Sequence, residues 1–367
     1  MTALRTLVVD DTIFYRKVLS DILTSFPDLE VVGTANNGKI ALSRIKSLQP
    51  DLVTLDVEMP EMNGLEVLQE IKNEGLQTDC LVVSSLTEKG GELTIKCLEL
   101  GAFDFIPKPD EESTEENLQA LTSSLTQKLR AYKRRREVQA VTRLKGPPIG
   151  EDRPAERRRE GSKAVLARTK APSQRADKAR AVAIGVSTGG PNALTAMLPD
   201  LPPDLGVPVF VVQHMPAVFT GSLAKALNAK CHLVVKEAVN GEVVSPGTVY
   251  IAPGGKQMKV ASGAGWQKII RVTDDPPENN CKPSADYLFR SVAREYGAKA
   301  TGVVMTGMGS DGKLGIKLMK ASGAMSIAQD SASCVVYGMP KAIVDDGLAD
   351  IVAPLEDLAA RILSSVR

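Results

Sequence analysis

Short apolar runs alternate with stretches of helical periodicity over most of the chain. In the first part, the apolar runs predict five strands, at 6–9, 31–35, 52–56, 80–84 and 104–106. Helical patterns lie between them at 12–24, 38–46, 64–73 and 91–100. The strands are rich in Val, Ile and Leu, which is typical of parallel strands buried on both faces. Five such units predict a flavodoxin-like, doubly wound parallel sheet.

The same alternation returns at residue 181 and continues toward the end of the chain. Strands are predicted at 181–186, 207–213, 249–252, 268–272, 302–306 and 325–328. Helices are predicted at 192–198, 219–228, 284–296, 312–321 and 339–345. The expected fold is a second doubly wound parallel sheet in a Rossmann-like three-layer domain. The sequence therefore predicts an α/β protein with two parallel-sheet domains, over 1–125 and 181–367.

A segment of different composition separates the two halves. A helical pattern over 114–141 ends in basic residues, and residues 133–180 contain 16 Lys and Arg against 6 Asp and Glu. Few large apolar residues occur there, so burial cannot offset the entropy of ordering, and 126–180 is predicted to be a basic helix extension with a flexible linker. A polybasic contact with nucleic acid or membrane is the alternative. The absence of interleaved aromatic residues disfavours nucleic acid.

Overall composition narrows the class of protein. The 367 residues carry a net charge of +1, which indicates no general preference for nucleic acid or membrane. The five cysteines are dispersed and odd in number, so we expect reduced thiols in a cytosolic protein. The chain starts with a strand-like segment, and no apolar run approaches the roughly 18 residues of a membrane span. We therefore expect a cytoplasmic protein without a signal peptide or membrane insertion.

Polar side chains follow the predicted strands of the N-terminal half. Asp10 and Asp11 follow the first strand, and Asp56 ends the third. Because the carboxyl ends of parallel strands meet at one edge, these carboxylates should converge, and a hard cation such as Mg²⁺ would relieve their repulsion. Ser84 and Lys108 add a hydroxyl and an ammonium at that edge, which suits phosphoryl transfer to an aspartate. Singly each residue could be a helix cap or a surface group, but their order at successive strand ends favours a site.

A second group of polar residues follows predicted strands of the C-terminal half. Ser187 lies in a glycine-rich turn between a strand and a helix, in a Gly-x-Ser-x-Gly pattern typical of nucleophiles. A phosphate-binding turn or a simple helix cap remain alternatives for it. Of the two histidines, His214 is the one at a strand's carboxyl edge, where it could act as a base. Asp311 follows another strand and could orient the imidazole, with a metal-loop or turn aspartate as the alternative.

Several motifs around these residues resemble those of two known families. Residues 1–125 resemble response-regulator receiver domains through Leu7-Val-Val-Asp-Asp11, Leu55-Asp-Val-Glu-Met-Pro60, Val82-Val-Ser-Ser85 and Phe105-Ile-Pro-Lys-Pro109. Residues 181–367 resemble the protein-glutamate methylesterases of bacterial chemotaxis (CheB) through Ile184-Gly-Val-Ser-Thr-Gly-Gly190, Gln213-His-Met-Pro216, Tyr250-Ile-Ala-Pro-Gly254 and Met305-Thr-Gly-Met-Gly309. The order Ser…His…Asp differs from that of α/β-hydrolases, so the nucleophile pattern does not indicate that fold.

The receiver resemblance implies roles for the N-terminal residues. Asp56 would be the phosphoacceptor, and a chemotaxis histidine kinase would supply the phosphoryl group. The Mg²⁺ ligands would be Asp10, Asp11, Asp56 and the backbone carbonyl of Glu58. Ser84 and Phe105 would form the switch pair, and Lys108 would contact the phosphoryl group.

The methylesterase resemblance implies that Ser187 is the nucleophile, His214 the base and Asp311 its orienting carboxylate. Thr188 would lie near the site, and the Met308 backbone N–H would help to form the oxyanion hole. The implied substrates are glutamate methyl esters on the cytoplasmic domains of methyl-accepting chemoreceptors, with methanol as product, without a cofactor for the esterase. Receptor glutamines would be deamidated by the same site, and receiver phosphorylation would relieve autoinhibition. A phospho-dependent binding protein with a silent hydrolase domain and a receiver-controlled nucleic-acid binder are the alternatives, although no helix-turn-helix pattern is present.

Overall fold

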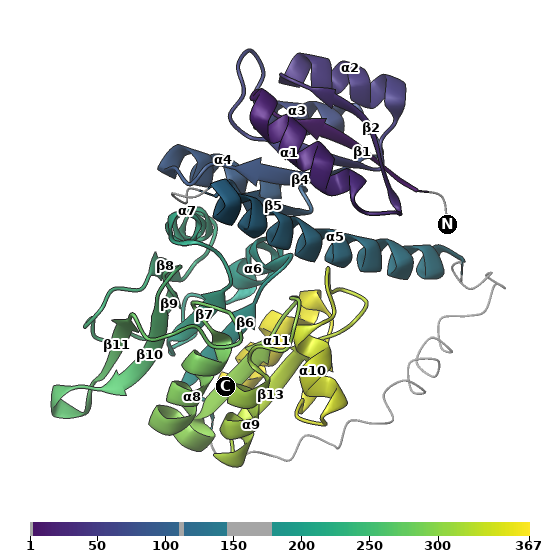
Figure 1. Cartoon of the computed structure of the whole chain (residues 1–367). Helices are drawn as coiled ribbons and strands as arrows, with labels where there is room; N and C mark the ends of the chain where they lie inside the picture. The colour runs from purple at the N-terminus through teal and green to yellow at the C-terminus, as the bar shows by residue number, and fades with distance from the viewer. Residues whose placement is uncertain (1–2, 110–113, 145–177) are drawn as a thin grey trace.

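The computed structural model describes residues 3–109, 114–144 and 178–367, and its elements form two domains, each built on a parallel β-sheet (Figure 1). The N-terminal sheet has the strand order β2-β1-β3-β4-β5. Its strands are β1 (Leu4–Val9), β2 (Leu29–Ala35), β3 (Leu52–Asp56), β4 (Asp79–Ser84) and β5 (Asp104–Pro107). Its helices are α1 (Ile13–Thr24), α2 (Gly38–Leu48), α3 (Gly64–Asn73), α4 (Glu88–Glu99) and α5 (Thr114–Leu144). Most of the predicted linker, residues 145–177, lies outside the described residues.

The C-terminal sheet has seven parallel strands in the order β14-β13-β12-β6-β7-β9-β8. They are β6 (Ala181–Val186), β7 (Val209–Gln213), β8 (Val234–Glu237), β9 (Thr248–Ile251), β12 (Ala300–Val304), β13 (Met325–Gln329) and β14 (Ile351–Ala353). The helices are α6 (Gly190–Met197), α7 (Ala217–Asn228), α8 (Ala285–Tyr296), α9 (Lys313–Ala321), α10 (Met339–Asp345) and α11 (Leu358–Val366). The predicted α/β class with two doubly wound sheets is confirmed. Among the described helices, none has a stretch long and apolar enough to cross a membrane.

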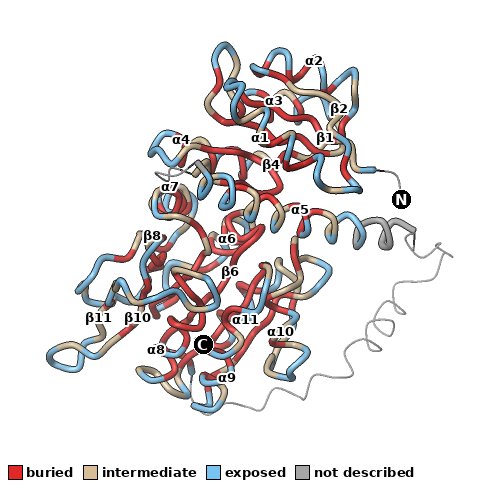
Figure 2. The backbone as a smooth tube through the Cα atoms, in the orientation of Figure 1, coloured by how far each residue is buried: buried red, intermediate tan, exposed pale blue. Residues whose placement is uncertain are grey.

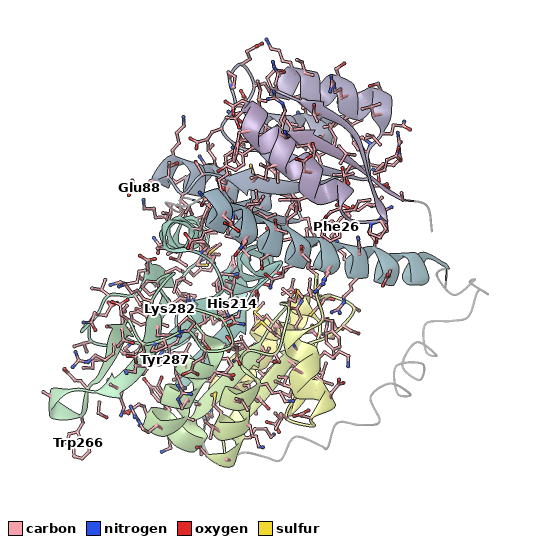
Figure 3. The ribbon with its side chains drawn as sticks, viewed as in Figure 1. Phe26, Glu88, His214, Trp266, Lys282 and Tyr287 are labelled. Atoms are coloured by element: carbon pink, nitrogen blue, oxygen red, sulfur yellow. The ribbon has the colours of Figure 1, made fainter. Side chains whose placement is uncertain are left out.

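One part of the C-terminal domain departs from the predicted pattern. The strand expected at 268–272 does not join the parallel sheet: β11 (Lys268–Thr273) pairs antiparallel with β10 (Gln257–Ser262) in a separate hairpin. Its partner β10 was not predicted as a strand, because polar and apolar side chains alternate along β10 and it lacks the continuous apolar run that marks a doubly buried strand. Figure 3 shows Trp266 at the outer tip of this hairpin, whereas His214 lies in the middle of the molecule.

Fully buried packing fixes the central strand of the C-terminal sheet. Figure 2 shows the central strands of both sheets as continuously buried elements. Phe289 on α8 is fully buried, and a Cβ added to Gly185 of β6 would lie 3.2 Å from its ring. A Cβ added to Gly315 of α9 would lie 2.5 Å from the Cβ of Phe289. Because these two glycines have no side chain, α8 packs closely against β6 and α9. This packing fixes the position of the carboxyl end of β6, where the turn that contains Ser187 begins.

The two domains meet along α4, β5 and α5 of the first and α6, α7 and the loops at the strand ends of the second (Figure 1). The rings of Phe105 and Phe219 lie 4.5 Å apart between centroids. Leu125 of α5 belongs to the same apolar cluster as Val336, and Met308 packs against that cluster. At the margin, Lys230 forms an ion pair of 2.8 Å with Glu99. The carboxyl edge of the C-terminal sheet therefore faces α5.

We predict that Phe289→Ala lowers the free energy of unfolding of the C-terminal domain by about 3–5 kcal/mol, because it leaves a cavity between α8 and β6. Urea denaturation followed by circular dichroism measures this. Trp266→Ala is the control, since that side chain is 98% exposed and its loss should change stability by less than about 0.5 kcal/mol. Equal effects of the two substitutions would contradict the prediction.

Candidate functional site

Carboxylates converge at the carboxyl edge of the N-terminal sheet, as predicted. Asp10 and Asp56 are buried and Asp11 is exposed, and one carboxylate oxygen of each lies within 4.8 Å of those of the other two. The Lys108 Nζ atom lies 2.8 Å from an oxygen of Asp10 and 2.8 Å from one of Asp56. The two buried carboxylates therefore share the single ammonium group of Lys108, and Asp11 adds a third carboxylate close to them.

The electrostatics of this cluster fit a hard divalent cation. Burial raises the pKa of Asp56 to about 6; Lys108 opposes this shift, and the charge of Asp10 adds to it. None of the described residues donates a hydrogen bond to the Glu58 backbone carbonyl, and the Ser85 hydroxyl donates to the Glu58 carboxylate. Carboxylate and carbonyl oxygens are the donors that Mg²⁺ prefers.

The predicted switch residues lie beside the cluster but face away from it. Ser84 is fully buried, and its hydroxyl donates to the carbonyl of Gly90 at 3.2 Å. Phe105 is 5% exposed and its ring packs against Phe219 of the C-terminal domain. Phe105, in β5, therefore joins the receiver sheet to the interface between the domains.

The predicted triad lies at the carboxyl ends of three neighbouring strands. Ser187 follows β6 and His214 follows β7, and the His214 backbone N–H donates to the carbonyl of Val186 at 3.2 Å. Asp311 lies in the loop after β12, the neighbour of β6 on the other side. The His214 Nε2 atom and the Asp311 Oδ2 atom are 2.8 Å apart. The structure thus joins His214 to Asp311 directly and brings Ser187 beside them.

Asp311 is held by the N-terminus of α8. Its Oδ2 atom accepts the Ala285 backbone N–H at 2.6 Å. Its Oδ1 atom accepts the Ser284 hydroxyl at 2.8 Å, the Asn279 amide at 2.9 Å and the Asp286 backbone N–H at 3.2 Å. Backbone N–H groups at a helix N-terminus favour a negative charge, so this carboxylate is held ionised in one orientation.

The histidine and the aspartate shift each other's proton affinity. Burial alone would lower the pKa of His214, but the hydrogen bonds to Asp311 and Cys281 and the charge of Asp311 raise it to about 9. Burial alone would raise the pKa of Asp311, but His214 and the α8 donors lower it to about 2. The His214 contribution to stability is complete below its ordinary pKa of 6.5 and is lost as pH rises through 9. The Asp311 contribution is present above 3.8 and is lost as pH falls through 2.

The predicted nucleophile, Ser187, is close to the other two predicted triad residues but is not hydrogen-bonded to His214. Ser187 is 9% exposed, and within the described part of the chain its hydroxyl makes no hydrogen bond to the His214 ring. The other ring nitrogen, Nδ1, faces the Sγ atom of Cys281 at 3.7 Å. Catalytic hydrogen bonds are often long before substrate binds. A Cβ on Gly307 would lie 2.8 Å from the Ser187 Cβ atom, so only glycine fits there.

The two residues predicted to lie near the developing oxyanion are neighbours of Ser187 and of Gly307, which packs against Ser187. Thr188 is buried and Met308 is half-buried, and the backbone N–H groups of both lack a partner among the described residues. Lys128 of α5 donates to Asp104 at 2.7 Å and lies 3.4 Å from the Thr188 hydroxyl. A side chain of the N-terminal domain therefore contacts the residue next to Ser187.

Gln213 is a site residue that the sequence reasoning missed. Its side chain is buried, and its Nε2 atom donates to the backbone carbonyls of Ser187 at 3.0 Å and of His214 at 3.3 Å. A Cβ on Gly190 would lie 1.9 Å from its Oε1 atom, which explains the glycine. Its position directly before His214 was the available signal. Asn279 and Ser284, which hold Asp311, were also missed because they lie far from it in sequence.

Comparisons with known proteins agree with this arrangement. A family model described as CheB methylesterase matches residues 182–362, and one described as response regulator receiver domain matches residues 6–120. Relatives from Desulfotalea psychrophila and Bacillus subtilis, both named protein-glutamate methylesterase/protein-glutamine glutaminase, are 51% and 46% identical, over 100% and 99% of this chain and of their own lengths. The crystal structure of the Thermotoga maritima CheB methylesterase catalytic domain is 40% identical, covers 51% of this chain and 98% of that chain, and has a TM-score of 0.50.

These matches and the fold define a hydrolase that carries a response-regulator receiver domain. The chain belongs to the CheB methylesterase family. The resemblance that the motifs indicated is thereby confirmed over the full length of the chain.

We predict that kcat/KM for ester hydrolysis rises with pH up to about 9, because the predicted base, His214, must be neutral to accept a proton and its pKa is raised to about 9. Asp311→Asn removes the charge that raises this pKa, so the rising limb should move to lower pH while the maximal rate falls by about 10⁴-fold. The pH–rate profiles of both proteins measure this. A rising limb at the same pH in the variant would contradict the role of Asp311.

Proposed function

We propose that this chain removes methyl esters from glutamate side chains on the cytoplasmic domains of methyl-accepting chemoreceptors, with release of methanol, and deamidates receptor glutamines. The proposal divides the chain into a receiver over 1–125, a basic extension and linker over 126–180, and a cytoplasmic methylesterase domain over 181–367. The observation that carries it is the hydrogen bond between His214 and Asp311 beside Ser187 at one sheet edge. The names of the full-length relatives supply the substrate class.

In the proposed mechanism, Ser187 attacks the ester carbonyl while His214 takes its proton. The backbone N–H groups of Thr188 and Met308 stabilise the oxyanion. The protonated His214, held by Asp311, gives its proton to the leaving methoxide, and methanol departs. Water then attacks the acyl-serine with His214 as base, and glutamate and free Ser187 are regenerated. No cofactor takes part in these steps, and at a glutamine the leaving group is ammonia.

The receiver half of the proposal assigns Asp56 as the phosphoacceptor, with a chemotaxis histidine kinase as donor. Mg²⁺ held by Asp10, Asp11, Asp56 and the Glu58 carbonyl would neutralise the acceptor and the phosphoryl oxygens. Lys108, already paired with Asp56 at 2.8 Å, would remain in contact with the phosphoryl group. No nucleic acid and no membrane insertion are part of this function.

The regulatory half of the proposal is that the receiver holds the esterase closed. It is supported by the contacts of Lys128 with Thr188 and of Phe105 with Phe219, which join α5 and β5 to the surroundings of the nucleophile. Phosphorylation would draw Ser84 toward Asp56 and free the space that Phe105 needs to leave Phe219. A ligand or modification that favours the separated arrangement would then increase the active population.

We predict that Ser187→Ala abolishes methanol release from methylated receptor membranes, because the variant lacks the hydroxyl that forms the acyl-serine. Methanol released by Ser187→Ala at the native rate would contradict the proposed nucleophile.

Asp56→Asn should keep the basal rate but lose the stimulation by a small-molecule phosphodonor, because the phosphoryl group has no acceptor. Asp11→Asn should also lose the stimulation, through weaker Mg²⁺ binding.

We predict that Lys230→Glu raises the basal rate of the unphosphorylated protein by up to about fivefold, since an exposed ion pair contributes at most about 1 kcal/mol. The substitution places two carboxylates where Lys230 and Glu99 now pair across the domain interface. The matched control is the charge swap Lys230→Glu with Glu99→Lys, which should restore the low rate. A swap as active as the single variant would contradict the closed arrangement.

A further inference from the structure

A thiol and an imidazole nitrogen lie together at the edge of the esterase site, and the proposed mechanism does not use the thiol. The Cys281 Sγ atom is 3.7 Å from the His214 Nδ1 atom. Both residues are half-buried, and Cys281 is a free cysteine. Cys281, His214 and Asp311 form one of the two groups of potential metal ligands found among the described residues, with ligand atoms within 4.8 Å of one another.

The distance between the two atoms fits a shared metal ion. Zinc binds cysteine sulfur at about 2.3 Å and histidine nitrogen at about 2.0–2.1 Å, which in a tetrahedral site places the two ligands roughly 3.5 Å apart. The present separation of 3.7 Å needs only a small adjustment. The Sγ atom is held nearby through a contact of 3.4 Å with the Asn279 carbonyl, so the pair is arranged in advance.

The orientation of the imidazole favours this site as well. The Nε2 atom faces the Asp311 carboxylate, so with the proton on Nε2 the lone pair of Nδ1 is directed toward Cys281. A carboxylate that accepts from the far nitrogen of a metal-binding histidine is a recurrent arrangement at zinc sites, where it fixes the ring and increases its basicity. Asp311 would play this part without touching the metal.

The donor set also selects the kind of cation. Asp311 already accepts hydrogen bonds on both oxygens, from His214, Ala285, Asn279, Ser284 and Asp286. It therefore has little capacity left for a hard cation, which would need oxygen ligands. One thiolate and one imidazole instead suit a borderline-soft ion such as Zn²⁺.

We infer that Cys281 and His214 form an inhibitory binding site for Zn²⁺ at the edge of the esterase centre. The Cys281 thiol loses its proton to solvent as the zinc–sulfur bond forms, and water occupies the remaining coordination positions. The ion takes the Nδ1 lone pair, so His214 cannot accept the proton of the nucleophile. Inhibition, though not metal binding, rests on the proposed role of His214 as the base.

Metal binding is tested with Co²⁺ as a spectroscopic substitute for zinc in the full-length, unphosphorylated protein. The native protein should show a thiolate-to-cobalt charge-transfer band that Zn²⁺ displaces, and the band should be absent in Cys281→Ser. Cys334→Ser is the matched control, since Cys334 is another half-buried cysteine of this domain. The acidic cluster of the receiver has no sulfur, so it gives no such band. A band that persists in Cys281→Ser would overturn the site.

Inhibition is tested by measuring methanol release over a series of buffered free Zn²⁺ concentrations, each variant being compared with its own zinc-free rate. Cys281→Ser should raise the half-inhibiting concentration by at least about tenfold, as expected for the loss of a ligand, whereas Cys334→Ser should not. A chelator should restore the native rate. A Cys281-dependent cobalt band without zinc inhibition would support the metal site and contradict His214 as the base, which separates the two proposals. Equal zinc sensitivity of the native protein and Cys281→Ser would overturn the inhibitory role.

Discussion

The arrangement of the candidate esterase centre depends on one carboxylate at a helix N-terminus. Asp311 accepts hydrogen bonds from the start of α8 and from Asn279, which fixes both of its oxygens. With its position fixed, it determines which nitrogen of His214 faces inward and therefore which nitrogen is free to face Ser187 or Cys281. Phe289 packs against β6 and so fixes the position of the strand that leads to Ser187. A shift of α8 would disturb all of these relations together.

The sequence predicts most of the fold because parallel strands leave a strong local signal. The strands at 52–56 and 181–186 have the predicted bounds, since each is a run of apolar residues ended by a polar or glycine-rich turn. The β10–β11 pair was missed or misplaced because β10 alternates in polarity, and the edge strands β8 and β14 were missed because they are short and partly exposed. Their pairing partners, rather than their own residues, determine that they are strands.

The candidate sites are predictable to a similar extent and for a similar reason. Asp10, Asp56 and Lys108 follow strand ends, and topology alone brings strand ends to one edge. Residues such as Gln213 and Asn279 act by side-chain contacts to backbone or carboxylate groups elsewhere in the chain. No spacing rule identifies such contacts, because they depend on the rotamers and loop paths of the folded domain. The contact of Lys128 with Thr188 is likewise a property of the domain interface and of neither domain alone.

The position of the single tryptophan has a practical consequence for observing the domains separate. Trp266 is 98% exposed at the tip of the β10–β11 hairpin, on the part of the esterase domain remote from α5 (Figure 3). Its indole is already surrounded by water, so its emission has almost no reason to change when α4 and α7 move apart. The native fluorescence of the protein is therefore a local probe of that hairpin, and a partner that covers the tip would blue-shift it. Domain separation calls instead for a pair of extrinsic labels placed across the α4–α7 contact.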